Sequence, residues 1–275
     1  MALMNIQLRS SSLNRYTTVN VCFPEMEGFE KMKGKPYQYQ PGVTYQTLWL
    51  FHGGGGDASD WIRKTSVERY ANENKLIVIC PSTYNSFYTD MAYGDAYYTW
   101  LTKELPEIMR YLLPISEKRE DTFVAGLSMG GYGALKWAMN EPERFACAGS
   151  FSGAVDMPNI LKENHLHDGV LDRDLRIVFD TVERAEHTKE DVLYMAEQDI
   201  KAGKELPRLY LTCGTEDFTW RFNTHARDVF QELGADLTWD ERPGNHTWDF
   251  WDQAIVRYLE WLPLRKAPIF AEEGK

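Results

Sequence analysis

Short apolar segments alternate with longer segments of helical periodicity from residue 44 onward. Two further segments, residues 3–8 and 17–23, alternate between apolar and polar side chains and predict an antiparallel hairpin. Six β-prone apolar runs predict strands at residues 44–51, 76–80, 121–125, 145–151, 207–213 and 235–242. Strands that alternate with helices usually form a mostly parallel sheet covered on both faces. We therefore expect an α/β fold with an eight-stranded, mostly parallel sheet.

Helices are predicted between these strands. We expect them at residues 61–74, with Ser59 or Asp60 as N-cap, at 134–139, at 219–233, closed by Gly234, and at 248–262. Another helix ends at residue 113, and we expect it to bend or restart at Pro106. The last helix is amphipathic, and its predicted buried side chains are Trp251, Ile255, Tyr258, Leu259 and Leu262.

Residues 154–206 break the alternation, because charged side chains dominate there and the predicted helices are short. One of these helices follows a capping sequence at 188–191. We interpret 154–206 as a partial lid at the edge of the active site, inserted into a single domain that spans 1–275. The sequence at 165–168, His-Leu-His-Asp, resembles a metal-ligand cluster, but no fourth ligand has a suitable spacing. We expect a solvated surface there and no metal.

Composition narrows the class of protein. A chain of 275 residues that is 43% hydrophobic can bury a sizeable core, and its formal charge of -11 argues against nucleic-acid partners. No apolar run approaches the roughly 20 residues that span a bilayer, and the first nine residues lack the features of a signal peptide. The four cysteines are far apart in sequence and fit buried free thiols. We therefore expect a cytoplasmic protein, with a homo-oligomer left open.

Ser128 lies in a G-x-S-x-G motif at 126–130, between a predicted strand and a predicted helix. This context is typical of a nucleophile elbow, in which the serine occupies a strained strand-to-helix turn. Gly126 and Gly130 then provide room for a backbone that packs too closely for a Cβ. The alternative is a glycine-rich turn before an ordinary helix.

A second glycine-rich loop, 53–56, follows the strand at 44–51 and is preceded by His52. No Gly-Lys-Ser/Thr follows, so it is not a phosphate-binding loop, but it fits an oxyanion loop. We expect the N–H groups of Gly54 and of Met129, the residue after the predicted nucleophile, to bind the oxyanion. For His52 we favour a hydrogen bond that braces the loop over a catalytic role.

Asp217 and His246 follow the last two predicted strands, so they should meet Ser128 at the carboxyl edge of the sheet. Their order along the chain, nucleophile, acid, histidine, is that of α/β-hydrolases. His246 would accept the proton of Ser128 and pass it to the leaving alcohol, and Asp217 would orient the imidazole. Glu216 is the alternative acid. This chemistry needs no metal or organic cofactor.

An aromatic stretch at 82–100 follows another strand. A loop at this edge can line a substrate pocket, and packing on the surface is an equally good interpretation for any single ring. The partner that these features predict is a small-molecule ester.

Nearly the whole chain resembles the tributyrin esterase branch of the esterase D-like α/β-hydrolases. The resemblance rests on five segments, which are Leu-Phe-His-Gly-Gly-Gly-Gly-Asp at 50–57, Ser-Phe-Tyr-Thr-Asp-Met-Ala-Tyr-Gly at 86–94, Gly-Leu-Ser-Met-Gly-Gly at 126–131, Cys-Gly-Thr-Glu-Asp-Phe at 213–218 and His-Thr-Trp-Asp-Phe-Trp-Asp at 246–252. It implies an α/β-hydrolase fold and carboxylesterase activity on short acyl chains. By position it also implies Ser128, Asp217 and His246 as catalytic residues, with oxyanion donors near Gly54 and Met129.

Relatives in the same superfamily suggest other activities. Some cleave feruloyl or acetyl groups from plant polysaccharide, some hydrolyse S-formylglutathione, and some are acyltransferases that move mycolyl groups. The glutathione branch usually has histidines beside the elbow serine and after the glycine pair, where this chain has Leu127 and Tyr132. That difference disfavours the glutathione activity. A non-enzymatic binding module would predict a broken triad, whereas all three residue types are present.

Overall fold

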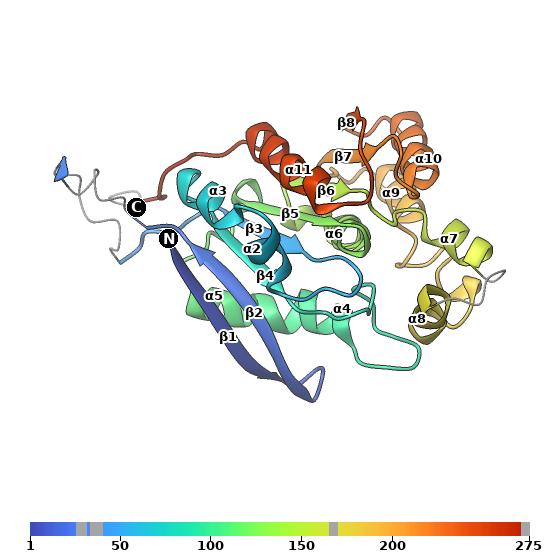
Figure 1. Cartoon of the computed structure of the whole chain (residues 1–275), viewed down its shortest axis with the longest axis horizontal. Coiled ribbons are helices and arrows are strands. Elements are labelled where there is room, and N and C mark those ends of the chain that lie inside the picture. The colour runs from blue at the N-terminus through green and yellow to red at the C-terminus, as the bar shows by residue number, and fades with distance from the viewer. Residues whose placement is uncertain (26–31, 34–40, 165–169, 271–275) are drawn as a thin grey trace.

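A computed structural model describes residues 1–25, 32–33, 41–164 and 170–270 of the chain. Within these ranges one sheet contains β1 (Ala2–Ser10), β2 (Arg15–Phe23), β3 (Thr47–Phe51), β4 (Ile77–Pro81), β5 (Thr122–Leu127), β6 (Cys147–Phe151), β7 (Arg208–Gly214) and β8 (Leu237–Arg242). The strand order is β1-β2-β4-β3-β5-β6-β7-β8 (Figure 1). Strand β2 runs antiparallel to both of its neighbours, β1 and β4, and the other pairs of neighbouring strands are parallel. The predicted α/β-hydrolase sheet of eight mostly parallel strands is confirmed.

Successive side chains of each strand face opposite helix layers, because side chains alternate across a sheet. On β3, Leu48 and Leu50 join one core cluster, and Trp49 and Phe51 join the other. The first cluster is covered by α2 (Asp60–Lys64), α3 (Val67–Glu73) and α11 (Trp248–Trp261). The second is covered mainly by α4 (Tyr97–Thr99), α5 (Leu105–Leu112), α6 (Met129–Asn140), α9 (Val192–Lys201) and α10 (Trp220–Glu232). Helices therefore cover both faces, as predicted.

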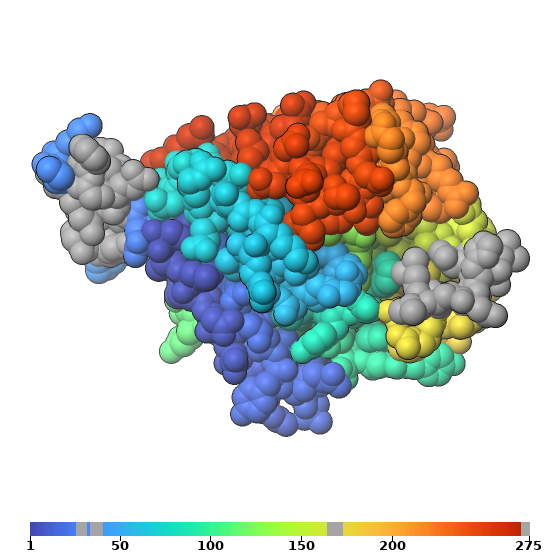
Figure 2. Space-filling model, viewed as in Figure 1, coloured from blue at the N-terminus to red at the C-terminus, as the bar shows by residue number. Residues whose placement is uncertain are grey.

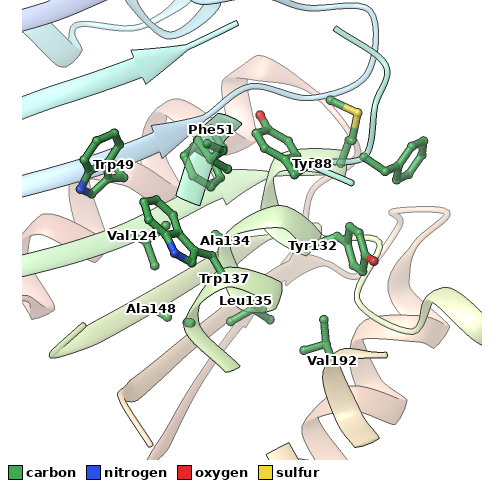
Figure 3. Close-up of a cluster of buried hydrophobic side chains, with 14 of the residues drawn as sticks. Trp49, Phe51, Tyr88, Val124, Tyr132, Ala134, Leu135, Trp137, Ala148 and Val192 are labelled. Atoms are coloured by element: carbon green, nitrogen blue, oxygen red, sulfur yellow. The ribbon is translucent and has the colours of Figure 1, made fainter. Parts of the chain in front are cut away.

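Helix α6 lies at the centre of the second layer, and every residue from Met129 to Met139 is buried. Figure 3 shows Trp137 of this helix next to Trp49 and Phe51 of β3, with ring centroids 5.4 and 6.2 Å apart. Phe51 also stacks on Tyr88 at 4.6 Å. Full burial of one such side chain contributes roughly 2–3 kcal/mol to the free energy of unfolding. This packing therefore holds in place the helix that begins directly after Ser128.

The predicted helix at 61–74 is wrong in one respect, because it is two helices, α2 and α3. Thr65 between them is extended, with φ -138° and ψ 178°. Its hydroxyl accepts the N–H of Val67 at 3.1 Å, which replaces a helical hydrogen bond. The preceding N-cap is Ser59, one of the two predicted residues, although its side chain makes no capping hydrogen bond.

Two other helix starts differ in detail from the prediction. The helix that ends near residue 113 contains a π-helical turn, η1 (Trp100–Glu104), directly before α5. Glu104 and Leu105 keep helical backbone angles, so the helix continues through the π-helical turn into α5, and Pro106 lies in the first turn of α5. Helix α9 is capped by Asp191, which accepts the N–H of Tyr194, because the hydroxyl of Thr188 already bonds the backbone around 184–190.

Between β6 and β7 lie α7 (Met157–Asn164), α8 (Val170–Phe179) and α9. Figure 1 shows α7 and α8 together at one end of the molecule, and Figure 2 shows their yellow-green and yellow atoms at the surface of that end. The sequence at 165–168, singled out for its metal-ligand residues, lies outside the described residues, as does most of the loop between β2 and β3.

Burial agrees with several predictions. The five predicted side chains of the last helix, Trp251, Ile255, Tyr258, Leu259 and Leu262, are buried. The four cysteines, all within the described ranges, are buried and free, as predicted. Gly234 has φ +73°, the left-handed conformation expected after a helix. No helix in the described ranges combines the length and the apolar character needed to cross a bilayer.

Candidate active site

The strand order places the candidate residues at one crevice. From β3 the chain crosses to β4 on one side and then returns past β3 to β5 on the other side. Loops that follow strands at such a reversal leave a crevice at the carboxyl edge of the sheet, where ligands bind in α/β proteins. The glycine loop follows β3, and Ser128 follows β5 directly.

Ser128 occupies the sharp turn between β5 and α6, with φ 53° and ψ -121°. A serine at this φ is strained by about 1–3 kcal/mol, and the surrounding backbone must hold it there. Its N–H donates to the Phe151 carbonyl at 2.9 Å. A Cβ on Gly126 would lie 2.3 Å from the Gly130 oxygen, and a Cβ on Gly130 would lie 2.5 Å from the His52 oxygen. Both glycines are therefore required by close approach.

Ser128, His246 and Asp217 form a continuous chain of hydrogen-bonded side chains. The Ser128 Oγ lies 2.9 Å from His246 Nε2. His246 Nδ1 lies 3.0 and 2.9 Å from the two carboxylate oxygens of Asp217. A carboxylate only accepts hydrogen bonds, so Nδ1 carries the proton and Nε2 is free to accept from the serine.

Asp217 is held in its charged form by the groups around it. Its side chain is fully buried, and burial alone would raise the pKa of the carboxyl. Hydrogen bonds from His246 and from the Thr219 backbone outweigh burial, and the pKa of Asp217 is lowered. The Thr219 N–H and hydroxyl both donate to Oδ1 at 2.8 Å. The carboxylate can therefore orient the imidazole without taking up its proton.

Glu216, the alternative acid, points elsewhere. Its carboxylate accepts the N–H of Gly244 at 2.5 Å and the hydroxyl of Thr215 at 2.9 Å. It thus braces the loop that carries His246 and does not contact the imidazole. The His246 ring itself lies between Phe218 and Trp251, with ring centroids 4.4 and 4.8 Å away.

The glycine loop supplies candidate oxyanion donors. Gly55 donates its N–H to Asn85 Oδ1 at 2.6 Å, and Gly56 donates to the Gly53 carbonyl at 3.2 Å. Within the described ranges, no acceptor is found for the N–H of Gly54 or of Met129. Both residues line the same cavity as Ser128.

His52 braces this loop, in agreement with the prediction. The Thr83 N–H donates to its Nε2 at 3.0 Å, so Nδ1 carries the proton and donates to the Gly53 carbonyl at 2.7 Å. Burial lowers the pKa of His52, which keeps the ring neutral. Both ring nitrogens are used, and neither contacts Ser128.

The cavity above Ser128 has a volume of about 630 Å³. Its apolar wall comes largely from outside the sheet and consists of Phe87, Met129, Ala154, Ile160, Leu175, Phe218 and Phe222. Three of these side chains, Ala154, Ile160 on α7 and Leu175 on α8, belong to the segment 154–206. Glu163 and Arg221 form an ion pair that also lines the cavity. In the aromatic stretch at 82–100, Phe87, Tyr88 and Trp100 belong to the core, and of these three Phe87 also lines this cavity.

Sequence reasoning missed two residues that support the site. Thr219 follows Asp217 in an Asp-x-Thr arrangement at the start of a helix, and this turn pattern could have identified it. Asn85 had no local signal, because its contact with Gly55 joins two separate loops. Within the described residues no group of three His, Cys, Asp or Glu side chains could hold a metal ion.

Comparison with known proteins gives a consistent result. A model of the esterase family described as "Putative esterase" matches residues 10–262. The chain is 28% identical over 265 residues to an acetyl esterase of Caldicellulosiruptor saccharolyticus, which covers 95% of this chain and 98% of that protein. A substrate-bound structure of a fluorophosphonate-binding serine hydrolase from Staphylococcus aureus is similar at TM-score 0.84 and 30% identity, over 95% of this chain and 98% of that one. An S-formylglutathione hydrolase from the same organism is similar at TM-score 0.81 and 30% identity, with the same coverage.

Proposed function

The chain belongs to the esterase family described as "Putative esterase" and is a carboxylic ester hydrolase, and we propose that it is a serine esterase for short-chain acyl esters. In this proposal Ser128 is the nucleophile, His246 the general base and acid, and Asp217 the residue that orients the imidazole. The observation that carries it is the 2.9 Å contact between Ser128 Oγ and the unprotonated Nε2 of His246. A serine hydroxyl is a weak nucleophile until such a base removes its proton.

The reaction follows from this geometry. Ser128 Oγ attacks the acyl carbon while His246 Nε2 takes its proton, and Asp217 stabilises the imidazolium. The N–H groups of Gly54 and Met129 bind the oxyanion of the tetrahedral intermediate. His246 then gives the proton to the leaving alcohol, which departs and leaves an acyl-enzyme. Water, deprotonated by His246, attacks the acyl-enzyme, and the carboxylic acid leaves as Ser128 regains its proton.

Hydrolysis of p-nitrophenyl acetate, butyrate and octanoate, with Ser128→Ala as the comparison, tests this proposal. We expect the variant to lose turnover by about 10⁴-fold or more, because nucleophile and base act as a unit. Its thermal unfolding should stay close to that of the parent. Turnover by the variant within about tenfold of the parent would refute the assignment.

The size and lining of the cavity support a preference within the esters. A space of about 630 Å³ lined by Phe87, Leu175 and Phe222 is far larger than an acetyl group. We propose that butyryl esters, including tributyrin, are hydrolysed better than acetyl esters. This is the preference expected of the tributyrin esterase branch. A kcat/KM that is highest for acetate would contradict it.

Two other substrate classes have specific support. The alternative of acetyl or feruloyl groups on plant polysaccharide is supported for the acetyl group by the acetyl esterase relative, and the similar S-formylglutathione hydrolase supports that thioester as a substrate. Leu127 and Tyr132 stand where the glutathione branch usually has histidines, which counts against S-formylglutathione as the substrate. Leu127 is buried in the core, and the buried Tyr132 hydroxyl donates to the Glu190 carbonyl. Comparing kcat/KM on methyl ferulate, acetylated xylan, S-formylglutathione and tributyrin separates these classes. Repeating the assay with an added alcohol measures acyl transfer.

We further propose that 154–206 acts as a partial lid within a single domain of residues 1–275. Support comes from Ile160 and Leu175, which form part of the cavity wall. We propose a cytoplasmic location as well, because four buried free thiols suit a reducing compartment.

A further inference from the structure

The four glycines at 53–56 form a tight turn that presents Gly54 to the cavity. The Gly56 N–H donates to the Gly53 carbonyl at 3.2 Å, so Gly54 and Gly55 are the central residues of a β-turn. Gly55 has φ +73°, as the third residue of a type II turn requires. The peptide between the two central residues is the one that rotates when such a turn changes type. With glycine at both positions, backbone sterics do not select one orientation.

Asn85 selects the orientation of that peptide. Its Oδ1 accepts the Gly55 N–H at 2.6 Å, and its Nδ2 donates to Asp174 Oδ2 at 2.9 Å. The Gly55 N–H can only donate and the Asp174 carboxylate can only accept, so the Asn85 amide has one satisfactory orientation. Asp174 belongs to α8, and only 14% of its side chain is exposed. Gly55, Asn85 and Asp174 all line the cavity above Ser128.

Rotation of the Gly54–Gly55 peptide would change the electrostatics of the site. The Gly54 carbonyl would then face Asn85 Oδ1, which now accepts the Gly55 N–H. The adjoining peptide, which carries the Gly54 N–H, would shift with it. Donors stabilise an oxyanion only when they already point at its position, so displacing the Gly54 N–H would raise the barrier.

We infer that Asn85 is a positioning residue for the oxyanion turn, oriented by Asp174 of helix α8. This inference rests on the proposed function, because it takes Ser128 as the nucleophile and Gly54 as an oxyanion donor. It also connects a helix of the segment 154–206 to the catalytic machinery through two hydrogen bonds. Asn85 itself does not touch the reacting atoms in this assignment.

Steady-state kinetics of Asn85→Ala on p-nitrophenyl butyrate provide the test. We expect kcat to fall by about 30- to 100-fold with KM changed less than about threefold, because the loss concerns the transition state. The affinity for 1-butaneboronic acid, which forms a tetrahedral adduct with an active serine, should fall by a similar factor. A kcat within about threefold of the parent, or a loss confined to KM, would overturn the inference.

An exchange variant guards against a general loss of structure. In Asn85→Asp/Asp174→Asn, the carboxylate now at position 85 can accept both from Gly55 and from the amide now at position 174, so both hydrogen bonds can form. We expect its kcat to exceed that of Asn85→Ala by about tenfold. If it is no better than Asn85→Ala, the hydrogen bonds are not the cause, and the inference fails.

Two comparisons complete the design. Asn159→Ala removes another asparagine–aspartate contact of the segment 154–206, the 2.8 Å bond to Asp156, outside the cavity above Ser128, and should leave kcat unchanged. Ser128→Ala distinguishes a failure of the proposed function from a failure of the role assigned to Asn85. If it keeps turnover, the proposed function fails. If it is inactive while Asn85→Ala is fully active, only the inference fails.

Discussion

Asp217 shows how single residues maintain a charge in a buried site. Burial raises the pKa of this carboxyl, but the His246 ring, the Thr219 N–H and the Ser152 side chain outweigh burial and lower it. The Thr219 hydroxyl also donates to Oδ1, at 2.8 Å. A carboxyl whose folded pKa is lowered stabilises the protein above its unfolded pKa. That stabilisation is lost as the pH falls through the folded pKa.

Thr219→Val removes one of these donors and leaves the shape of the side chain nearly unchanged. The pKa of Asp217 should rise, so acid unfolding should begin at a higher pH. The free energy of unfolding at pH 7 should fall by about 1–3 kcal/mol, and kcat should fall by about tenfold. Thr219→Ser keeps the hydroxyl and should behave like the parent in pH titration and kinetics. Identical acid transitions for Val and Ser would contradict this account.

The choice of acid is tested by a pair of substitutions. Asp217→Asn should lower kcat by about 10⁴-fold, because the amide favours the wrong imidazole tautomer. Glu216→Gln keeps one acceptor oxygen and changes only the loop contacts with Gly244 and Thr215, so it should cost less than about tenfold. Equal losses in kcat for both variants would show that the assignment of the acid is wrong.

Residue types and chain order were enough to predict Ser128, Asp217 and His246 as partners that meet. The G-x-S-x-G motif has a local cause, since Gly126 and Gly130 are required by contacts within the elbow and with the neighbouring strand. Asn85 could not be predicted in this way. Its role depends on where α8 and the glycine turn lie in space.

Helix α6 connects the elbow to the segment 154–206 through a buried charge. Lys136 Nζ lies 2.6 Å from Glu190 Oε2 and 2.7 Å from Thr89 Oγ1, and 1% of the lysine side chain is exposed. Burial lowers the pKa of Lys136, while Glu190 acts in the opposite direction. The three residues come from α6, from the turn before α9 and from the loop after β4.

Lys136→Met should therefore destabilise the fold strongly. It removes the cation 2.6 Å from the buried Glu190 carboxylate and leaves Lys189 Nζ, 3.9 Å away, as the remaining cation. Breaking a buried ion pair in this way typically costs about 3–5 kcal/mol. The double variant Lys136→Met/Glu190→Leu removes both charges and should be more stable than the single variant. Urea unfolding measures both free energies. A single variant within about 1 kcal/mol of the parent would contradict the account.

Elements with strong patterns were predicted well, and their breaks were not. The strands and the helix α11 follow from hydrophobic spacing alone. The break at Thr65 depends on a hydroxyl that replaces a backbone partner, and Asp191 caps α9 because Thr188 is already engaged. Such side-chain competition for backbone groups leaves little trace in periodicity.

At the scale of the whole molecule, the sheet order brings four distant loops to one edge. Alternation of strands and helices predicts the fold class and that edge. It does not predict that β4 lies between β2 and β3, because strand order depends on the handedness and packing of crossovers. The alternation also does not predict that side chains of α7 and α8 line the cavity.

Since α8 contributes to that wall, chain-length preference should respond to it. Leu175→Trp fills part of the cavity and should lower kcat/KM for p-nitrophenyl octanoate by about tenfold relative to acetate. Ile177→Trp, on the same helix but outside this cavity, is the matched control. If the octanoate-to-acetate ratio is unchanged in Leu175→Trp, the cavity is not the acyl site.

Covalent labelling with diethyl p-nitrophenyl phosphate, followed by peptide mass spectrometry, tests the central claim most directly. The account predicts one diethylphosphoryl group per chain, on Ser128. Esterase activity should fall in proportion to the fraction of chains that carry this group. Ser128→Ala should take up none, and His246→Ala should react far more slowly. Inactivation that accompanies an adduct on another residue, with Ser128 unmodified, would contradict it.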